Sequence, residues 1–175
     1  MKITFRKANR SDFDSILQIY NDSHTEEENG CTATGWQRNV YPSAETIEKA
    51  LERDDLFVEE ADGKVVGTAI INQIQVDVYE NAPWQFIVPD DKIMVLHTLA
   101  ISPSAKGHGL GKAFVDFYRD YAARNNCTNL RMDTNETNKI ARSFYKKLGF
   151  KEIAVRECEF NGIKNIHLVL LEKKV

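Results

Sequence analysis

A nearly continuous run of nine mostly apolar residues, Ile93–Ile101, is the feature that most limits the folds open to this chain. The run is too short to cross a bilayer, and it lacks the alternation of a half-exposed strand, so it predicts a β-strand buried on both faces. Pro103 and a glycine-rich turn follow. A helix comes next, with apolar residues at i, i+3, i+4, i+7 and i+11, which are Leu110, Ala113, Phe114, Phe117 and Tyr121. A central strand that leads into a crossover helix is typical of an α/β sheet.

The remaining elements follow from periodicity and turn residues. The first half predicts a strand, two helices and an antiparallel pair of strands joined by Asp62-Gly63, with these ranges: Ile3–Lys7, a helix led by Ser11 and Asp12, a helix from Ser43, Leu56–Glu60 and Val65–Val78. The second half predicts a strand, a helix stopped by Gly149 and a hairpin around Asn161-Gly162, with these ranges: Asn129–Asp133, Asn138–Leu148, Phe150–Phe160 and Lys164–Leu171.

The resulting order is β-α-α-β-β-β-α-β-α-β-β. It predicts an α/β fold with a mixed, twisted sheet and helices on both faces. We expect the fourth and fifth strands to be parallel and to diverge at their ends, because a helix-containing crossover joins them. No repeat or linker divides the chain, so residues 1–175 are expected to form a single domain.

Composition narrows the classes of function. The net charge is −3 and the basic residues are scattered, which argues against nucleic acid as a partner. No apolar stretch has the length of a signal peptide or a membrane span, so the sequence predicts a cytoplasmic protein that does not engage membranes. The three cysteines show no ligand spacing, which predicts free thiols and no metal site. The oligomeric state stays open, with a homodimer among the alternatives.

The turn Lys106-Gly107-His108-Gly109-Leu110-Gly111-Lys112 lies between the buried strand and an amphipathic helix. Glycines let a backbone approach a ligand closely, and the free N–H groups at a helix N-terminus favour an anion, so we expect a pyrophosphate here. The spacing fits neither a nucleotide-hydrolysing P-loop, which needs G-x-x-x-x-G-K-[ST], nor the G-x-G-x-x-G of a dinucleotide site.

Three blocks of sequence resemble the GCN5-related N-acetyltransferase (GNAT) superfamily. Lys106-x-x-Gly109-x-Gly111 is similar to its acetyl-CoA signature [QR]-x-x-G-x-[GA], with lysine in the first position. Leu99–Pro103 resembles its strand end "L-x-V-x-P", and Asn138–Phe150 resembles its helix "N-x-x-A-x-x-F-Y-x-x-x-G-F". The resemblance is strong over about residues 93–160 and rests on element order elsewhere.

The resemblance implies acetyl-CoA as co-substrate and no metal. It implies that the pyrophosphate binds at Lys106, Gly107, His108, Gly109, Leu110, Gly111 and Lys112. It further implies that the pantetheine arm pairs with the backbone of Leu99 and Ile101 and contacts Asn138, and that Tyr145 lies near the thioester sulfur. From the residues alone, Asn138, Ala141 and Tyr145 share one helix face, although Tyr145 could equally be a packing residue.

His97 is the second candidate for chemistry. The strand around it resembles the corresponding strand of one group of these enzymes, in which a histidine at this offset belongs to the path of proton removal. Strand parity predicts His97, Leu99 and Ile101 on one face. We expect His97 to remove the amine proton, directly or through water, the N–H near Leu99 to stabilise the oxyanion, and Tyr145 to donate to the leaving sulfur. The alternative for His97 is a structural residue.

The predicted reaction is direct transfer of an acetyl group from acetyl-CoA to a primary amine of a small molecule or peptide. Two other classes stay open: a non-catalytic acyl-CoA-binding sensor, and an interaction domain without ligand. The segment with Glu26-Glu27-Glu28, Trp36 and Tyr41-Pro42 usually shapes the acceptor pocket in this family. Its acidic run could attract a cationic amine or could be a solvated face, and Trp84 could line the pocket or cap the core.

Overall fold

The computed structural model describes residues 1–175 as a seven-stranded mixed sheet with four α-helices. The elements are β1 (Ile3–Lys7), α1 (Phe13–Glu28), α2 (Ala44–Glu52), β2 (Leu56–Ala61), β3 (Lys64–Asn72), β4 (Ile93–Ile101), α3 (Leu110–Arg124), β5 (Asn129–Asn135), α4 (Lys139–Lys147), β6 (Lys151–Phe160) and β7 (Ile163–Lys174). This is the order that the sequence predicts, and the strands lie side by side as β1-β2-β3-β4-β5-β7-β6.

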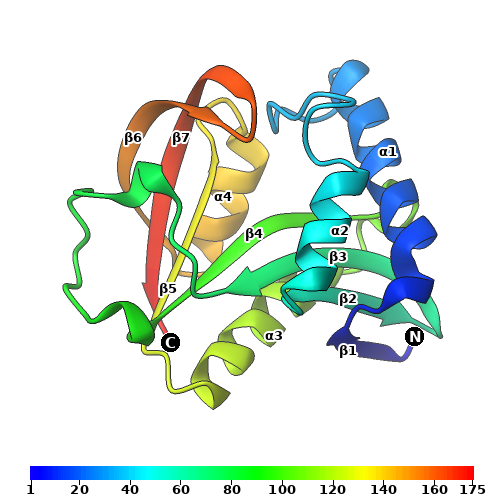
Figure 1. Ribbon diagram of the computed structural model, residues 1–175, viewed down its shortest axis with the longest axis horizontal. Coiled ribbons are helices and arrows are strands. Elements are labelled where there is room, and N and C mark those ends of the chain that lie inside the picture. Colours follow the sequence, from blue (N-terminus) through cyan, green and yellow to red (C-terminus); the bar gives the residue numbers. More distant parts are fainter.

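The sheet divides at its centre. β4 and β5 form the one parallel pair, and only Ile93–Val95 pairs with Asn129–Arg131. Beyond Val95 the two strands diverge: in Figure 1, β4 runs toward α1 and α2 while β5 rises alongside β7 and β6. The predicted parallel, diverging pair is therefore confirmed. The divergence opens a gap at the carboxyl ends of the two strands, where ligands bind in α/β sheets.

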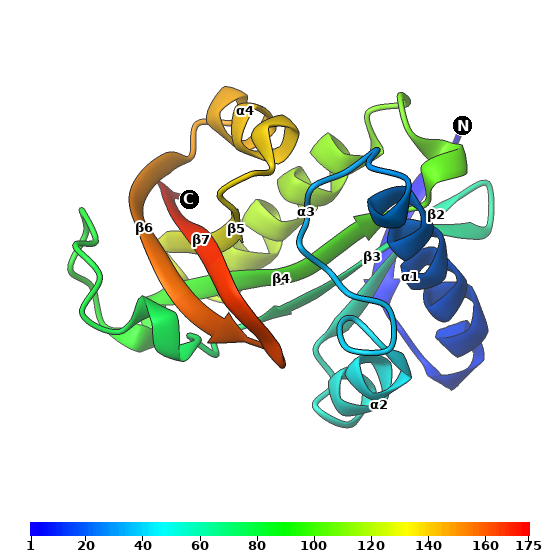
Figure 2. The same ribbon diagram turned by 90° about the horizontal axis from the view of Figure 1, so that it is seen from above.

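Helices cover both faces of the sheet (Figure 2). On one face α3 packs Phe114, Val115 and Tyr118 against apolar residues of β2 to β5. On the other, α1 and α2 pack Ile16, Tyr20 and Ile47 against β2 to β4. A third apolar cluster joins β4 and β7 beneath the segment that connects β3 to β4. None of the helices has the length and apolar character that crossing a bilayer requires.

Turn chemistry was predictive at both hairpins. Asp62 and Gly63 have φ of 49° and 80°, and Asn161 and Gly162 have 51° and 81°. These left-handed pairs are what a tight two-residue hairpin needs. The predicted strand Val65–Val78 was too long, because β3 ends at Asn72. Asn72 pairs with Val95, so residues beyond 74 would lie past the start of β4 and have no partner on that side.

A β-bulge in β4 overturns the parity prediction. Ile70 pairs with His97, but Thr68 pairs with Ala100, so β4 holds one residue more than β3 over this stretch. Thr98 takes φ of 53°, which is rare for a β-branched residue. An extra residue reverses the alternation of side chains. Leu99 and Ile101 therefore pack toward α3, whereas His97 lies on the opposite face and lines pockets there.

Candidate active site

A narrow pocket of about 140 Å³ occupies the gap between β4 and β5. We call it the inner pocket; its walls include Trp36, Tyr41, Leu96, His97, Thr98, Leu99, Asp133, Asn135, Asn138, Ala141, Tyr145 and Phe160. Four of the predicted site residues therefore meet in one place: His97 and Leu99 from β4, and Asn138 and Tyr145 from α4 and its N-cap. Beyond Val95 the edge of β4 that faces this gap has no strand beside it, so backbone groups there need other partners.

The glycine-rich turn lies beyond the pocket, where β4 ends and α3 begins. Gly107 and Gly109 have φ of 86° and 77°, and no heavy atom lies within 4 Å of where a Cβ would be at either position. Gly109 is the N-cap of α3. A Cβ on Gly111 would lie 3.5 Å from the Phe144 ring and 4.0 Å from Ile101, so the turn adjoins both β4 and α4. The turn thus presents an open backbone surface at a helix N-terminus.

Two of the turn's cations have partners within the protein. Lys106 Nζ lies 2.9 Å from Glu26 of α1, and Lys112 Nζ lies 2.5 Å from Asp116 one turn along α3. Both pairs are exposed enough for an anionic ligand to replace the carboxylate at small cost. His108 is exposed, and its Nδ1 lies 3.3 Å from the carbonyl oxygen of Ala105.

Tyr145 lies in the inner pocket with its ring packed against Phe144 and Phe150. Burial and the nearby charge of Asp133 raise the pKa of Tyr145, and its hydroxyl has no hydrogen bond within the protein. The group is therefore a protonated, unengaged donor that faces the pocket. Asn138 has a structural role as well: its Oδ1 accepts from the N–H of Ala141 at 3.1 Å and caps α4, which leaves its Nδ2 as a donor.

Asp133 is a pocket residue that sequence reasoning missed. Its Oδ2 accepts a hydrogen bond from the Tyr79 hydroxyl at 2.7 Å. Burial raises the pKa of Asp133 to about 6, even though the Tyr79 bond favours the ionised form. The sequence did contain a signal for Asp133, because it is an acidic residue that follows Leu130 and Met132 in a predicted strand. Acidic side chains are rarely buried unless they are paired or take part in function.

A chain of hydrogen bonds determines the tautomer of His97. Asn72 Nδ2 donates to Asp55 at 2.8 Å, while Asn72 Oδ1 accepts from the N–H of Ile74 at 2.9 Å. His97 Nε2 lies 3.0 Å from the same Oδ1. An amide oxygen can only accept, so Nε2 carries the proton and Nδ1 is left as an acceptor. Burial lowers the pKa of His97 to about 4, against an opposing effect of Asp55, so the ring is neutral at neutral pH.

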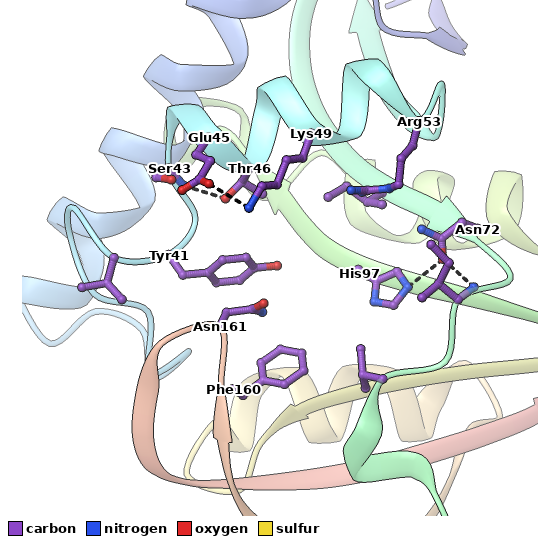
Figure 3. Close-up of a pocket in the computed structure, with 14 residues that line it drawn as sticks. Tyr41, Ser43, Glu45, Thr46, Lys49, Arg53, Asn72, His97, Phe160 and Asn161 are labelled. Carbon is purple, nitrogen blue, oxygen red and sulfur yellow. Dashed lines mark hydrogen bonds and ion pairs between the residues drawn. The ribbon is translucent and has the colours of Figure 1, made fainter.

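A second pocket of about 440 Å³ adjoins the first (Figure 3). We call it the outer pocket; its walls include Val40, Tyr41, Ser43, Glu45, Thr46, Lys49, Arg53, Ile70, Asn72, His97, Phe160 and Asn161. Tyr41, His97 and Phe160 line both pockets, so they stand where the two meet. Tyr41 is fixed there by a hydrogen bond between its hydroxyl and the Thr98 hydroxyl at the bulge.

The acidic run Glu26–Glu28 has internal partners. Glu27 accepts from Thr32, Thr34 and Gly35 at 2.8 to 2.9 Å and organises the loop after α1. Glu28 pairs with Arg38, and Glu26 pairs with Lys106. Each carboxylate of the run therefore has a partner within the protein, and Glu28 is also 55% exposed to solvent.

The two tryptophans differ in their placement. Trp36 lines the inner pocket edge-on to Tyr41, with ring centroids 6.3 Å apart. Trp84 lies outside both pockets and stacks on Arg131, with 4.0 Å between the guanidinium carbon and the ring centroid. Trp84 therefore caps the core, which was one of its two predicted roles.

Known proteins share this sequence pattern and fold. The acetyltransferase (GNAT) family model matches residues 13–150. An uncharacterized N-acetyltransferase of Methanocaldococcus jannaschii is 23% identical over 169 residues, covering 93% of this chain and 67% of its own. A GNAT-family acetyltransferase structure from Streptococcus agalactiae superposes with a TM-score of 0.82 at 19% identity, covering 99% of this chain and 95% of that one.

A structure of yncA from Salmonella typhimurium, determined with its cofactor acetyl-CoA, superposes with a TM-score of 0.70 at 18% identity, covering 99% of this chain and 94% of that one. The family match spans most of the chain, including the glycine-rich turn and α4. The chain belongs to the GNAT family and is an acetyl-CoA-dependent N-acetyltransferase.

Proposed function

We propose that the protein transfers an acetyl group from acetyl-CoA directly to a primary amine of a small molecule or peptide that enters through the outer pocket. The observation that carries the proposal is the meeting of two pockets at Tyr41, His97 and Phe160. One pocket lies in the β4–β5 gap, and the other is lined by α2. Two substrates can therefore approach one point from opposite sides.

The residues fit the co-substrate. The edge of β4 beside the gap can pair with the amides of a pantetheine arm, and Asn138 Nδ2 is a further donor. The N–H groups of Gly109 to Lys112 can bind the pyrophosphate, with Lys106 released from Glu26. When bound, acetyl-CoA supplies an activated acetyl group as a thioester.

We assign proton removal to Asp133 and orientation of the amine to His97. Only a neutral amine attacks a carbonyl, so a proton must be taken up in the pocket. The pKa is about 6 for Asp133 and about 4 for His97. Protonation of Asp133 is therefore easier than protonation of His97, by roughly 3 kcal/mol. His97 Nδ1 can accept a hydrogen bond from the attacking amine and so hold it in line.

The remaining roles fall to Leu99 and Tyr145. The N–H near Leu99 lies in the bulge and can donate to the developing oxyanion. Tyr145 can donate to the leaving sulfur. Because its pKa is raised, we expect a hydrogen bond to the thiolate and not a complete proton transfer.

Amine-dependent release of CoA, followed with a panel of primary amines, tests the proposal. We expect an N-acetylated product identified by mass spectrometry, with no release in the absence of an acceptor. A protein that binds acetyl-CoA in calorimetry but acetylates nothing across a broad panel would instead be the acyl-CoA sensor that the sequence left open.

A further inference from the structure

The outer pocket has a charged wall formed by one helix and the residue after it. Glu45, Lys49 and Arg53 follow one another at i, i+4 and i+8 and extend along α2 over the pocket. Figure 3 shows them above the cavity, with Tyr41, Phe160 and Asn161 across from them and His97 at the end beside Asn72. The proposed function places acetyl-CoA in the β4–β5 gap and at the glycine-rich turn, so the chemistry of this wall bears on the acceptor.

The guanidinium group of Arg53 is hydrogen-bonded along one edge, and its other edge is free. Its Nε lies 2.7 Å and its Nη2 lies 3.2 Å from the carboxylate oxygens of Asp55. The Nη1 hydrogens and one Nη2 hydrogen have no partner within the protein, and that edge of a guanidinium matches a second carboxylate. The side chain of Arg53 is 40% exposed and that of Asp55 is 9% exposed, so the carboxylate lies behind the guanidinium. The guanidinium is therefore fixed in place before any ligand arrives.

The two pockets differ in the charges that line them. The outer pocket presents the cations Lys49 and Arg53 and the anion Glu45; Lys49 pairs with Glu45 at 2.7 Å, and Arg53 pairs with Asp55, which lies behind it and is not part of the pocket wall. The inner pocket carries the carboxylate of Asp133. The charges of both pockets reach the passage between them. Burial raises the pKa of Tyr41 to about 12; the hydrogen bond with Thr98 acts against this rise, the charge of Asp133 adds to it, and the charge of Arg53 has a smaller effect against it.

On the basis of the proposed function, we infer that the acceptor is an amine that also carries a carboxylate, an amino acid in the chemical sense. Arg53, with Lys49 beside it, binds the carboxylate in the outer pocket, and the amine extends past Tyr41 and His97 toward Asp133. A polyamine would place a second cation against Arg53. A peptide N-terminus has an amide where this wall favours a carboxylate.

Matched acceptors test the inference without altering the protein. For each of several side chains, kcat/KM is measured for the amino acid, for its carboxamide, and for the amine that lacks the carboxyl group. We expect the amino acid to be preferred by at least about tenfold, the low end for a charge-assisted hydrogen bond. Equal values, or a preference for the carboxamide, would overturn the inference and leave the acetyltransferase assignment intact.

Variants then locate the preference. Arg53→Gln should lower the ratio of kcat/KM for the amino acid to kcat/KM for the carboxamide by about tenfold or more. The ratio is the readout because Arg53 also reaches His97 through Asp55 and Asn72, and a loss by that route affects both acceptors equally. Glu45→Gln is the matched control on the same wall and should retain the preference. Because Arg53 also pairs with Asp55, a melting curve of Arg53→Gln is needed to establish that its fold is intact. Arg53→Lys, which keeps the positive charge, is measured beside it. If folded Arg53→Gln still prefers the amino acid over the carboxamide as strongly as wild type, the inference is refuted.

A binding measurement separates this inference from the proposed function. Calorimetric titration with an N-acetylated amino acid and with its amide needs no turnover. Binding of the acid alone, lost in Arg53→Gln, supports the carboxylate site even if no amine in the panel is acetylated. Failure of the acid to bind, together with unselective acetylation, would refute the site and support the function.

Discussion

Asp133→Asn gives the most informative test of how the proton is removed. The change keeps the shape of the side chain and an oxygen that can accept from the Tyr79 hydroxyl 2.7 Å away, but it removes the base. We expect kcat to fall by about 10²- to 10⁴-fold, the usual reach of general acid–base catalysis. His97→Asn should cost less, because the role we propose for His97 is orientation only.

The pH profile of the wild-type enzyme distinguishes the two residues. A base must be unprotonated to act, so activity per neutral amine should rise through its pKa and level off above it. If Asp133 is the base, with a pKa of about 6, activity at pH 5 should be about one-tenth of the plateau. If His97 is the base instead, with a pKa of about 4, activity at pH 5 should be about nine-tenths of the plateau.

Stability provides the control for this variant. The pKa of Asp133 is raised from 3.8 to about 6 in the folded state, so its ionisation opposes folding increasingly between about pH 4 and pH 6 and by a constant amount above that. The neutral amide of Asp133→Asn removes that opposition, and the variant should melt at or above the wild-type temperature at pH 8. A profile that stays flat down to pH 5, with nearly full activity in folded Asp133→Asn, would refute the assignment.

Two further predictions concern the glycine-rich turn and the buried carboxylate of Glu59. Gly109→Ala and the control Gly63→Ala both place a Cβ at positive φ, 77° and 80°, with open space around it. Each should cost about 1–2 kcal/mol of stability, but only Gly109→Ala should weaken acetyl-CoA binding by about tenfold or more in calorimetry. Glu59 is fully buried with neither carboxylate oxygen hydrogen-bonded, and burial raises its pKa to about 7. Its unfolded pKa is about 4.5, so its ionisation opposes folding increasingly as pH rises from about 4.5 to about 7 and by a constant amount above that. Glu59→Gln should therefore be about 1–3 kcal/mol more stable than wild type at pH 8 and similar at pH 4 in urea unfolding. An advantage of the variant that does not grow between pH 4 and 7 would contradict this.

The element order could be predicted because each element carries its own signal. These signals are local: the apolar run Ile93–Ile101, the helical periodicity after Gly109 and the Asp62-Gly63 turn. Local preferences of this kind agree with the folded structure in natural sequences, so they predict the elements correctly. The parallel pairing of β4 and β5 was also predictable, since a helix-containing crossover joins them.

The site could be predicted only in part. The bulge at Thr98 has no local signature, since threonine normally favours regular strand, yet one extra residue moved His97 to the other face. The Arg53–Asp55–Asn72–His97 chain joins three segments through tertiary contacts, so no spacing along the sequence reveals it. Asp133 carried a signal, but a lone acid near the end of a strand is ambiguous until its burial is known.

The kcat of Tyr145→Phe tests most directly that acetyl transfer takes place in the inner pocket. The change deletes a hydroxyl that makes no hydrogen bond within the protein, so melting temperature and acetyl-CoA affinity should barely move. If the hydroxyl donates to the leaving thiolate, kcat should fall by about 10²- to 10⁴-fold. A kcat within a few-fold of wild type, in a variant that binds acetyl-CoA normally, would contradict the proposed site of transfer.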